Sequence, residues 1–182
     1  MIRTTVTALA LATAATGVSA QENPMVGGAP MMADMNIVEN AMNSPVNTVL
    51  VGLVQAAGLA ETLMGPGPYT VFAPTDEAFA PIGQATVDEL LLPENQETLS
   101  NILLCHVVSG EVMSDMLEEM IEDDDGEYEI KTLGTCILTA TYENGAFELM
   151  DQNNTVANIE IADVRQSNGV IHVIDAVMMP AM

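Results

Sequence analysis

Apolar residues in the first two-thirds of the chain recur mostly at helical spacing. Those within 37–41 share one helical face, and those within 50–57 keep the same spacing up to Gly58, a residue type that commonly ends helices. Thr86–Glu89 matches a capping box, in which two side chains bond reciprocally to the backbone at a helix start. The apolar residues within 99–103 again share one face. These patterns predict several helices in this part of the chain.

Beyond Gly126 the apolar residues alternate with polar ones, which is the period of a half-buried strand. The alternation runs through residues 128–130 and 136–142. Asn144–Gly145 then interrupts it, and this dipeptide favours the two-residue turn of a β-hairpin. We therefore expect the C-terminal third of the chain to be a sheet.

Two apolar segments outside this alternation also predict strands. Tyr69–Ala73 follows the turn-forming run Gly65–Pro68. Val170–Ile174 follows Asn168–Gly169 and is apolar on both faces apart from His172, which predicts a central place in the sheet. Helices first and strands later, without regular alternation, indicate an α+β domain. No segment repeats another, so we expect one copy of the domain.

The first twenty residues have the organisation of a secretory signal peptide. Arg3 precedes an apolar stretch from Val6 to Ala15, and the small residues Val18–Ala20 predict cleavage before Gln21. The apolar stretch is shorter than the roughly 20 residues that a bilayer requires. We therefore expect residues 1–20 to be removed during export, which gives a periplasmic or secreted protein.

Residues 21–35 are rich in Met, Gly and Pro and show no apolar periodicity. This composition predicts a flexible leader, and the folded domain is expected to span residues 36–180. No segment after residue 20 is apolar and long enough to predict a membrane span.

Acidic residues dominate the charge, with 26 Asp and Glu against 3 Lys and Arg, and a formal net charge of −23. Removal of residues 1–20 leaves Lys131 and Arg165, so the charge becomes 2 − 26 = −24. Such a charge repels nucleic acid and anionic membrane surfaces, and both are excluded as partners. It either attracts cations and basic partners or only keeps the protein soluble, and we expect the second.

Cys105 and Cys136 are the two cysteines, and an exported compartment allows a disulfide between them. The alternative is a pair of buried free thiols, which behave as small apolar side chains. We expect the disulfide. It would close a loop of about 30 residues and stabilise the fold by restricting the unfolded chain.

Three segments together resemble a known family, the fasciclin domains. Tyr69–Phe79 is similar to the first signature box of the family and Ser167–Pro180 to the second, while Leu103–Gly110 lies where the family has a tyrosine–histidine motif. Two boxes in this order and spacing are more specific than any single short motif. The resemblance covers residues 36–180. It implies a wedge of mostly antiparallel strands flanked by helices, with the two boxes as neighbouring central strands.

The resemblance also implies candidate adhesion positions. Cys105 stands where the family usually has tyrosine, while His106 is retained, and in animal relatives this motif is linked to receptor-dependent adhesion. A second family element, an aspartate followed by an aliphatic residue, falls on Asp163 and Val164, although relatives usually have isoleucine after the aspartate. His106, Asp163 and Val164 are therefore candidates. The alternative is that His106 and Asp163 make buried hydrogen bonds.

Residue chemistry gives little support to catalysis. A nucleophilic Ser or Cys needs a base beside it, and His106 and His172 are the two histidines. Ser109 is near His106 but lacks the glycine two positions earlier that a nucleophile elbow requires. We expect no enzyme activity and no cofactor. The expected function is adhesion or matrix interaction, with a protein, a polysaccharide or a second copy of the chain as partner.

A metal-ion binding protein is the alternative function. Glu122–Glu127 offers hard oxygen ligands for calcium, but it is not an EF-hand loop, because Ile121 and Thr132 would occupy the first and last positions. The leader methionines offer soft sulfur ligands for a cuprous ion. They are Met25, Met31, Met32 and Met35. We expect residues 122–127 to form a solvated acidic turn and the leader methionines to be irregular apolar residues. No metal site is therefore assigned.

Overall fold

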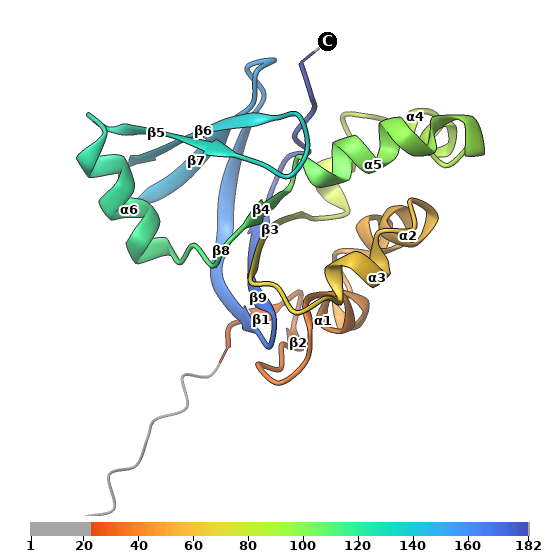
Figure 1. Cartoon of the computed structure of the whole chain (residues 1–182), viewed down its shortest axis with the longest axis horizontal. Helices are drawn as coiled ribbons and strands as arrows, with labels where there is room; N and C mark the ends of the chain where they lie inside the picture. The colour runs from red at the N-terminus through yellow and green to blue at the C-terminus, as the bar shows by residue number, and fades with distance from the viewer. Residues whose placement is uncertain (1–22, 182) are drawn as a thin grey trace, which may run out of the picture.

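A seven-stranded sheet forms the centre of the molecule, with helices packed on both of its faces (Figure 1). The structure is a computed structural model that describes residues 23–181. The sheet order is β4-β3-β9-β8-β7-β6-β5, and a separate hairpin, β1-β2, precedes it. The strands are β1 Met25–Val26, β2 Ala29–Pro30, β3 Tyr69–Pro74, β4 Val107–Ser109, β5 Glu127–Lys131, β6 Ile137–Glu143, β7 Ala146–Met150, β8 Val156–Gln166 and β9 Gly169–Ile174. The helices are α1 Ile37–Asn43, α2 Thr48–Ala56, α3 Ala60–Leu63, α4 Gln84–Leu90, α5 Gln96–Leu104 and α6 Ser114–Asp123, with short 3₁₀ turns η1 Glu77–Phe79 and η2 Pro93–Asn95.

The two segments that resemble fasciclin boxes lie side by side in the sheet. β3 and β9 are parallel neighbours, with Val71 opposite Ile171 and Ala73 opposite Val173, and the other strand pairs of the described residues are antiparallel. Every residue of β9 is buried, which explains why its sequence is apolar on both faces. The predicted α+β fold, mostly antiparallel with these two strands as central neighbours, is confirmed.

The sheet separates two hydrophobic cores, because successive strand residues point to opposite faces. On one face, Val71 and Ala73 of β3 pack with the helices α1 to α5. On the other face, Phe72 of β3 packs with β5, β6 and β7 and with Leu117 and Ile121 of α6. Figure 1 shows α6 on the opposite side of the sheet from the other helices. β3 therefore contributes side chains to both hydrophobic cores.

The hairpin between β6 and β7 forms where the sequence predicted it. Asn144 and Gly145 have φ angles of 54° and 84°, so both central residues adopt the left-handed conformation of a primed turn. Glycine adopts this conformation without steric cost, and asparagine tolerates it. The turn sets Glu143 opposite Ala146 and thereby fixes the register of the two strands.

Part of the predicted leader belongs to the folded domain. Residues 25–30 form the β1-β2 hairpin, and Val26 and Met31 are buried in the core beneath the helices. The side-chain amide of Asn23 donates to the carbonyl of Arg165 at 2.6 Å and accepts from its N–H at 3.0 Å. The prediction of a flexible leader is therefore wrong for residues 23–35. Single apolar side chains can be buried without any periodicity, so the pattern did not reveal them.

The predicted capping box at residues 86–89 does not form. α4 begins at Gln84, after Gly83, and no side chain caps it, so Thr86 lies inside the first turn and the predicted capping box is wrong. Gly83, at φ 83°, turns the chain into the helix instead.

The predicted signal peptide, residues 1–20, lies outside the described residues.

Candidate functional site

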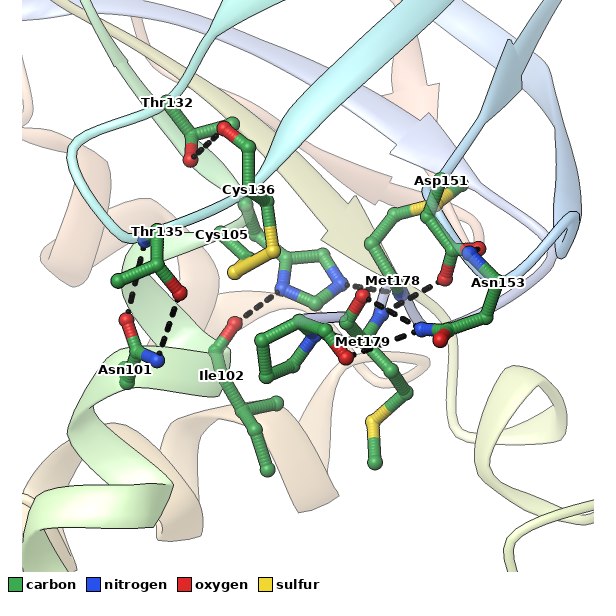
Figure 2. The surroundings of a disulfide bond; sticks show 12 residues. Asn101, Ile102, Cys105, Thr132, Thr135, Cys136, Asp151, Asn153, Met178 and Met179 are labelled. Atoms are coloured by element: carbon green, nitrogen blue, oxygen red, sulfur yellow. Dashed lines mark hydrogen bonds between the residues drawn. A yellow bond between two sulfur atoms is a disulfide. The ribbon is translucent and has the colours of Figure 1, made fainter. Parts of the chain in front are cut away.

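A buried disulfide links the helical layer to the sheet (Figure 2). Cys105 directly follows α5, and Cys136 directly precedes β6. Their Cα atoms are 5.1 Å apart, and both side chains are buried in the core that α6 covers. The expected bond is present, and it lies too deep for contact with an external partner.

Backbone hydrogen bonds fix the loop that carries Cys136. The N–H of Leu133 donates to the carbonyl of Val107 at 2.7 Å, and the N–H of Gly134 donates to the carbonyl of Leu104 at 2.9 Å. The first bond occupies a carbonyl on the edge strand β4, and the second occupies one of the last carbonyls of α5. The loop therefore supplies hydrogen-bond donors both to the sheet edge and to the C-terminal end of α5.

Asn101 and Thr135 complete this attachment with a reciprocal pair of bonds. The amide N–H of Asn101 donates to the Thr135 hydroxyl oxygen at 2.9 Å, and the backbone N–H of Thr135 donates to the amide oxygen of Asn101 at 3.1 Å. Figure 2 shows both bonds beside the disulfide. We call residues 132–136, held in this way against α5 and β4, the clasp.

Two hydrogen bonds hold His106 in one neutral tautomer. Its Nε2 accepts from the backbone N–H of Met178 at 2.9 Å, so Nδ1 carries the proton and donates to the carbonyl of Ile102 at 2.8 Å. Burial lowers the pKa of His106 from 6.5 to about 4, and it outweighs the opposing effects of the Ile102 bond and the Asp151 charge. The side chain is 2% exposed. Its ring therefore has no nitrogen free for a receptor or a substrate.

A buried carboxylate, Asp151, holds the end of the chain beside His106 (Figure 2). One oxygen accepts from the N–H of Met179 at 2.9 Å, and the other accepts from the N–H groups of Asn153 and Thr155 at 2.8 and 2.9 Å. The amide of Asn153 donates to the carbonyls of Met179 and Pro180, each at 3.0 Å. Sequence reasoning missed this cluster. The turn-forming composition of 151–154 was the available signal, and it could not indicate the partners at 179 and 180.

Asp163 lies in β8 and contacts Ser114, the first residue of α6. It has a φ angle of 61° beside an irregularity in the pairing of β8 with β9. Its carboxylate accepts from the backbone N–H of Ser114 at 2.8 Å and also from the Ser114 hydroxyl, which satisfies the first turn of α6. The side chain is half-buried, whereas Val164 is fully buried in the core beneath α1 to α5. Asp163 is thus the one adhesion candidate with an exposed part.

His172 is neutral for the same reason as His106. Its Nδ1 accepts from the N–H of Asp163 at 3.3 Å, and its Nε2 donates to the carbonyl of Val112 at 2.8 Å. Burial lowers its pKa, against the opposing effects of the Val112 bond and the Asp163 charge. Both histidines of the chain therefore have both ring nitrogens engaged in structural bonds.

The places considered for metal ions do not form a cage within residues 23–181. No three His, Cys, Asp or Glu side chains there are grouped closely enough to hold an ion. Residues 122–127 are exposed, and Gly126 donates its N–H to the carbonyl of Ile121 at 2.9 Å, which makes the acidic turn a helix end. Among the leader methionines, Met31 is buried in the core. Within residues 23–181, no helix is long and apolar enough to cross a bilayer.

Comparisons with known proteins agree with this architecture. A model of the fasciclin domain family matches residues 45–180. Protein sll1483 of Synechocystis sp. is 38% identical over 162 residues, which are 89% of this chain and 83% of that protein. The chain therefore belongs to the fasciclin domain family.

More distant relatives share the domain. Cell surface glycolipoprotein MPB83 of Mycobacterium bovis is 32% identical over 167 residues, which are 88% of this chain and 68% of that protein. The solved structure of a FAS1 domain pair from the insect cell adhesion molecule Fasciclin I superposes with a TM-score of 0.68 at 18% identity, over 79% of this chain and 50% of that one. The structural likeness shows that the fold is the same.

Proposed function

We propose that this chain is an exported, non-catalytic module that binds partners at the cell surface or in the surrounding matrix. Membership of the fasciclin domain family is the observation that carries the proposal. Among the proteins that resemble it, one is named a cell surface glycolipoprotein and another is a cell adhesion molecule. The Cys105–Cys136 disulfide supports export, because such bonds persist in oxidising compartments outside the cytoplasm.

The state of the two histidines supports binding over catalysis. A general base needs a ring nitrogen within reach of a substrate proton, and in His106 and His172 each ring nitrogen is already bonded to the protein. We assign His106 the role of a positioning residue, which fixes the end of the chain beneath the surface. Asp163 positions α6, and its exposed part remains a candidate contact.

A binding assay tests the proposal directly. Labelled protein from Gln21 to Met182 is incubated with native cells and with extracted extracellular matrix, beside an unfolded polypeptide of the same composition in scrambled order. The expected result is saturable binding that the scrambled polypeptide does not show. Equal binding of the two would mean that the charge alone is responsible, and the proposal would fail.

Export is tested separately by fractionation of cells that express the full chain. We expect the protein in the periplasm or the medium, with Gln21 as its first residue and no thiol that reacts with an alkylating reagent. Recovery in the cytoplasm with residues 1–20 still attached would contradict the proposed localisation.

A further inference from the structure

The seven-stranded sheet ends in two edge strands, β4 and β5, and these edges are covered to different extents. At β4 the clasp lies across the edge, where the carbonyl of Val107 accepts from the N–H of Leu133 at 2.7 Å. At β5 the residues Glu127, Glu129 and Lys131 are exposed. β5 is therefore the open edge of the sheet.

Alternate residues of β5 direct their backbone groups away from the sheet. Thr132 donates its N–H to the carbonyl of Cys136 at 3.2 Å, and hydrogen-bonded pairs alternate along an antiparallel ladder, so the even-numbered residues of β5 are bonded to β6. The backbone groups of residues 127, 129 and 131 consequently point outward. Among these groups, only the N–H of Glu127 has a hydrogen-bond partner within residues 23–181, the Asp124 carbonyl at 3.3 Å. The other outward N–H and carbonyl groups are available to a further strand.

The side chains along this edge lie on two different faces. Tyr128 and Ile130 belong to the core that α6 covers, and Tyr128 is half-buried there. Successive residues of a strand point to opposite faces, so Glu127, Glu129 and Lys131 lie on the face away from α6. A strand added to β5 would distribute its own side chains in the same way, with every second residue beside the carboxylates.

Charge selects the residues of such a strand. Glu127 and Glu129 lie on the edge itself, and the exposed acidic turn 122–125 leads directly into it. Opposite charges on neighbouring strands stabilise their pairing, and like charges oppose it. Because the formal charge of the chain is −23, acidic strands and second copies of this chain are repelled. The edge therefore favours a basic partner.

We infer that β5 binds an extended protein segment with Lys or Arg at alternate positions, which adds a strand to the sheet. The basic side chains of this segment lie beside Glu127 and Glu129, and apolar residues between them extend the core beside Tyr128. The inference rests on the proposed surface-binding function and names the chemistry of one partner. Backbone bonds give such a contact its affinity, and the alternating side chains give it specificity.

The test is a titration of labelled protein, from Gln21 to Met182, with an acetylated and amidated heptapeptide of alternating lysine and valine. Its binary pattern is the same in both directions, so it fits parallel and antiparallel pairing. We expect the bound peptide to slow hydrogen exchange of the Glu129 and Lys131 amides about tenfold or more, because these N–H groups gain acceptors. Two-dimensional amide NMR measures the exchange.

A second peptide separates strand pairing from attraction between charges. The same heptapeptide with methylated backbone nitrogens keeps its positive charge but has no N–H to donate to β5. It should bind about tenfold more weakly or worse, and it should protect neither amide. A glutamate–valine heptapeptide should not bind.

A pair of double variants locates the site. Glu127→Gln/Glu129→Gln removes two exposed carboxylates from the edge and should weaken binding by about three- to tenfold. Glu94→Gln/Glu97→Gln removes the same charge from exposed positions in η2 and α5, which are separate from β5. This matched control should leave the affinity nearly unchanged.

The inference is overturned if the lysine–valine peptide does not bind at millimolar concentration, if either comparison peptide binds as tightly, or if the two double variants bind alike. Sedimentation of the protein alone tests for another occupant. A dimer in which the Glu129 and Lys131 amides are already protected would assign the edge to a second copy, and this too would overturn the inference.

The cell-binding assay distinguishes failure of this inference from failure of the proposed function. Saturable binding to cells and matrix by a protein whose β5 edge fails the peptide tests would refute this inference and leave the proposed function intact. A protein that binds neither the peptide nor cells and matrix would refute both.

Discussion

Position 134 has room for glycine and no larger residue. A Cβ there would lie 2.8 Å from the Asn101 carbonyl oxygen and 2.8 Å from the Cys105 backbone nitrogen, and backbone atoms cannot move aside cheaply. We expect Gly134→Ala to destabilise the protein by about 1–3 kcal/mol, the usual cost of an overfilled site. Urea unfolding measures the change.

Gly52 provides the matched control for this substitution. It lies within α2, and a Cβ at that position would meet nothing within 4 Å. Gly52→Ala should therefore stabilise the protein by about 0.5–1 kcal/mol, because alanine favours the helix. If Gly134→Ala were as stable as the wild type, the close contact between the clasp and α5 would be refuted.

Asp163 combines a backbone role with a capping role. Its φ angle of 61° suits Asp and Asn better than alanine, and its carboxylate accepts the Ser114 N–H. Asp163→Ala should cost about 1–3 kcal/mol through the lost cap and the added backbone strain. Asp163→Asn should cost less, because the amide oxygen can still accept that bond. Thermal unfolding of the two variants measures the difference.

The same pair of variants separates a structural role from a contact role. If Asp163→Asn keeps its stability but loses cell binding, the exposed part of Asp163 contacts the partner. If stability and binding fall together in Asp163→Ala only, Asp163 acts by holding α6. An equal loss of stability in both variants would contradict the capping role.

The clasp and α5 behave as one element because a covalent bond and several hydrogen bonds join them. The disulfide closes a loop with a sequence separation of 31 residues. Replacing both cysteines, in the double variant Cys105→Ser/Cys136→Ser, should cost about 3–4 kcal/mol, mainly because the unfolded chain gains conformational freedom. Guanidinium unfolding measures this loss. A change below about 1 kcal/mol would mean that the hydrogen bonds alone hold the clasp.

The two neutral buried histidines make the stability of the whole molecule dependent on pH. The pKa of His106 is lowered to about 4 in the folded state, and an unfolded imidazole has the ordinary value of 6.5. Between these values the unfolded chain binds the extra proton, so the contribution of His106 is complete above about pH 6.5 and is lost as the pH falls toward 4. The loss is about 3 kcal/mol for this residue.

Chemical unfolding at several pH values between 7 and 4 measures this dependence. The lowered pKa of His172 causes a further loss of folding stability as the pH falls. His106→Asn removes the titrating group, so the variant should lose less stability than the wild type between pH 6.5 and 4. Equal slopes for the two proteins would contradict the neutral, buried state of His106.

The formal charge of −23 makes the folded molecule repel itself, because folding brings the carboxylates closer together. Sodium chloride shortens the screening length to about 10 Å at 0.1 M, so the melting temperature should rise with salt. Calorimetry in sodium and calcium chloride at equal ionic strength tests for specific binding. An extra rise of the melting temperature with calcium would restore the metal-binding alternative for residues 122–127.

Local patterns in the amino-acid order were enough to predict the class of fold and its centre. Alternating residues predicted the strands after Gly126, and Asn144–Gly145 predicted the turn between β6 and β7. The run of 170–174, apolar on both faces apart from His172, predicted its central place. Each of these features depends on residues close together in the sequence, and burial on one or two faces leaves a regular repeat.

Contacts between distant segments could not be read in this way. Val26 and Met31 enter the core singly, and Asp151 finds its partners at the end of the chain, so neither leaves a repeat. The clasp likewise contacts α5 only because the chain folds back on itself. Hydrogen bonds and burial depend on distances in space, and no local sequence pattern relates two residues that come into contact only in the folded chain. Folding therefore decides where this chain can bind a partner.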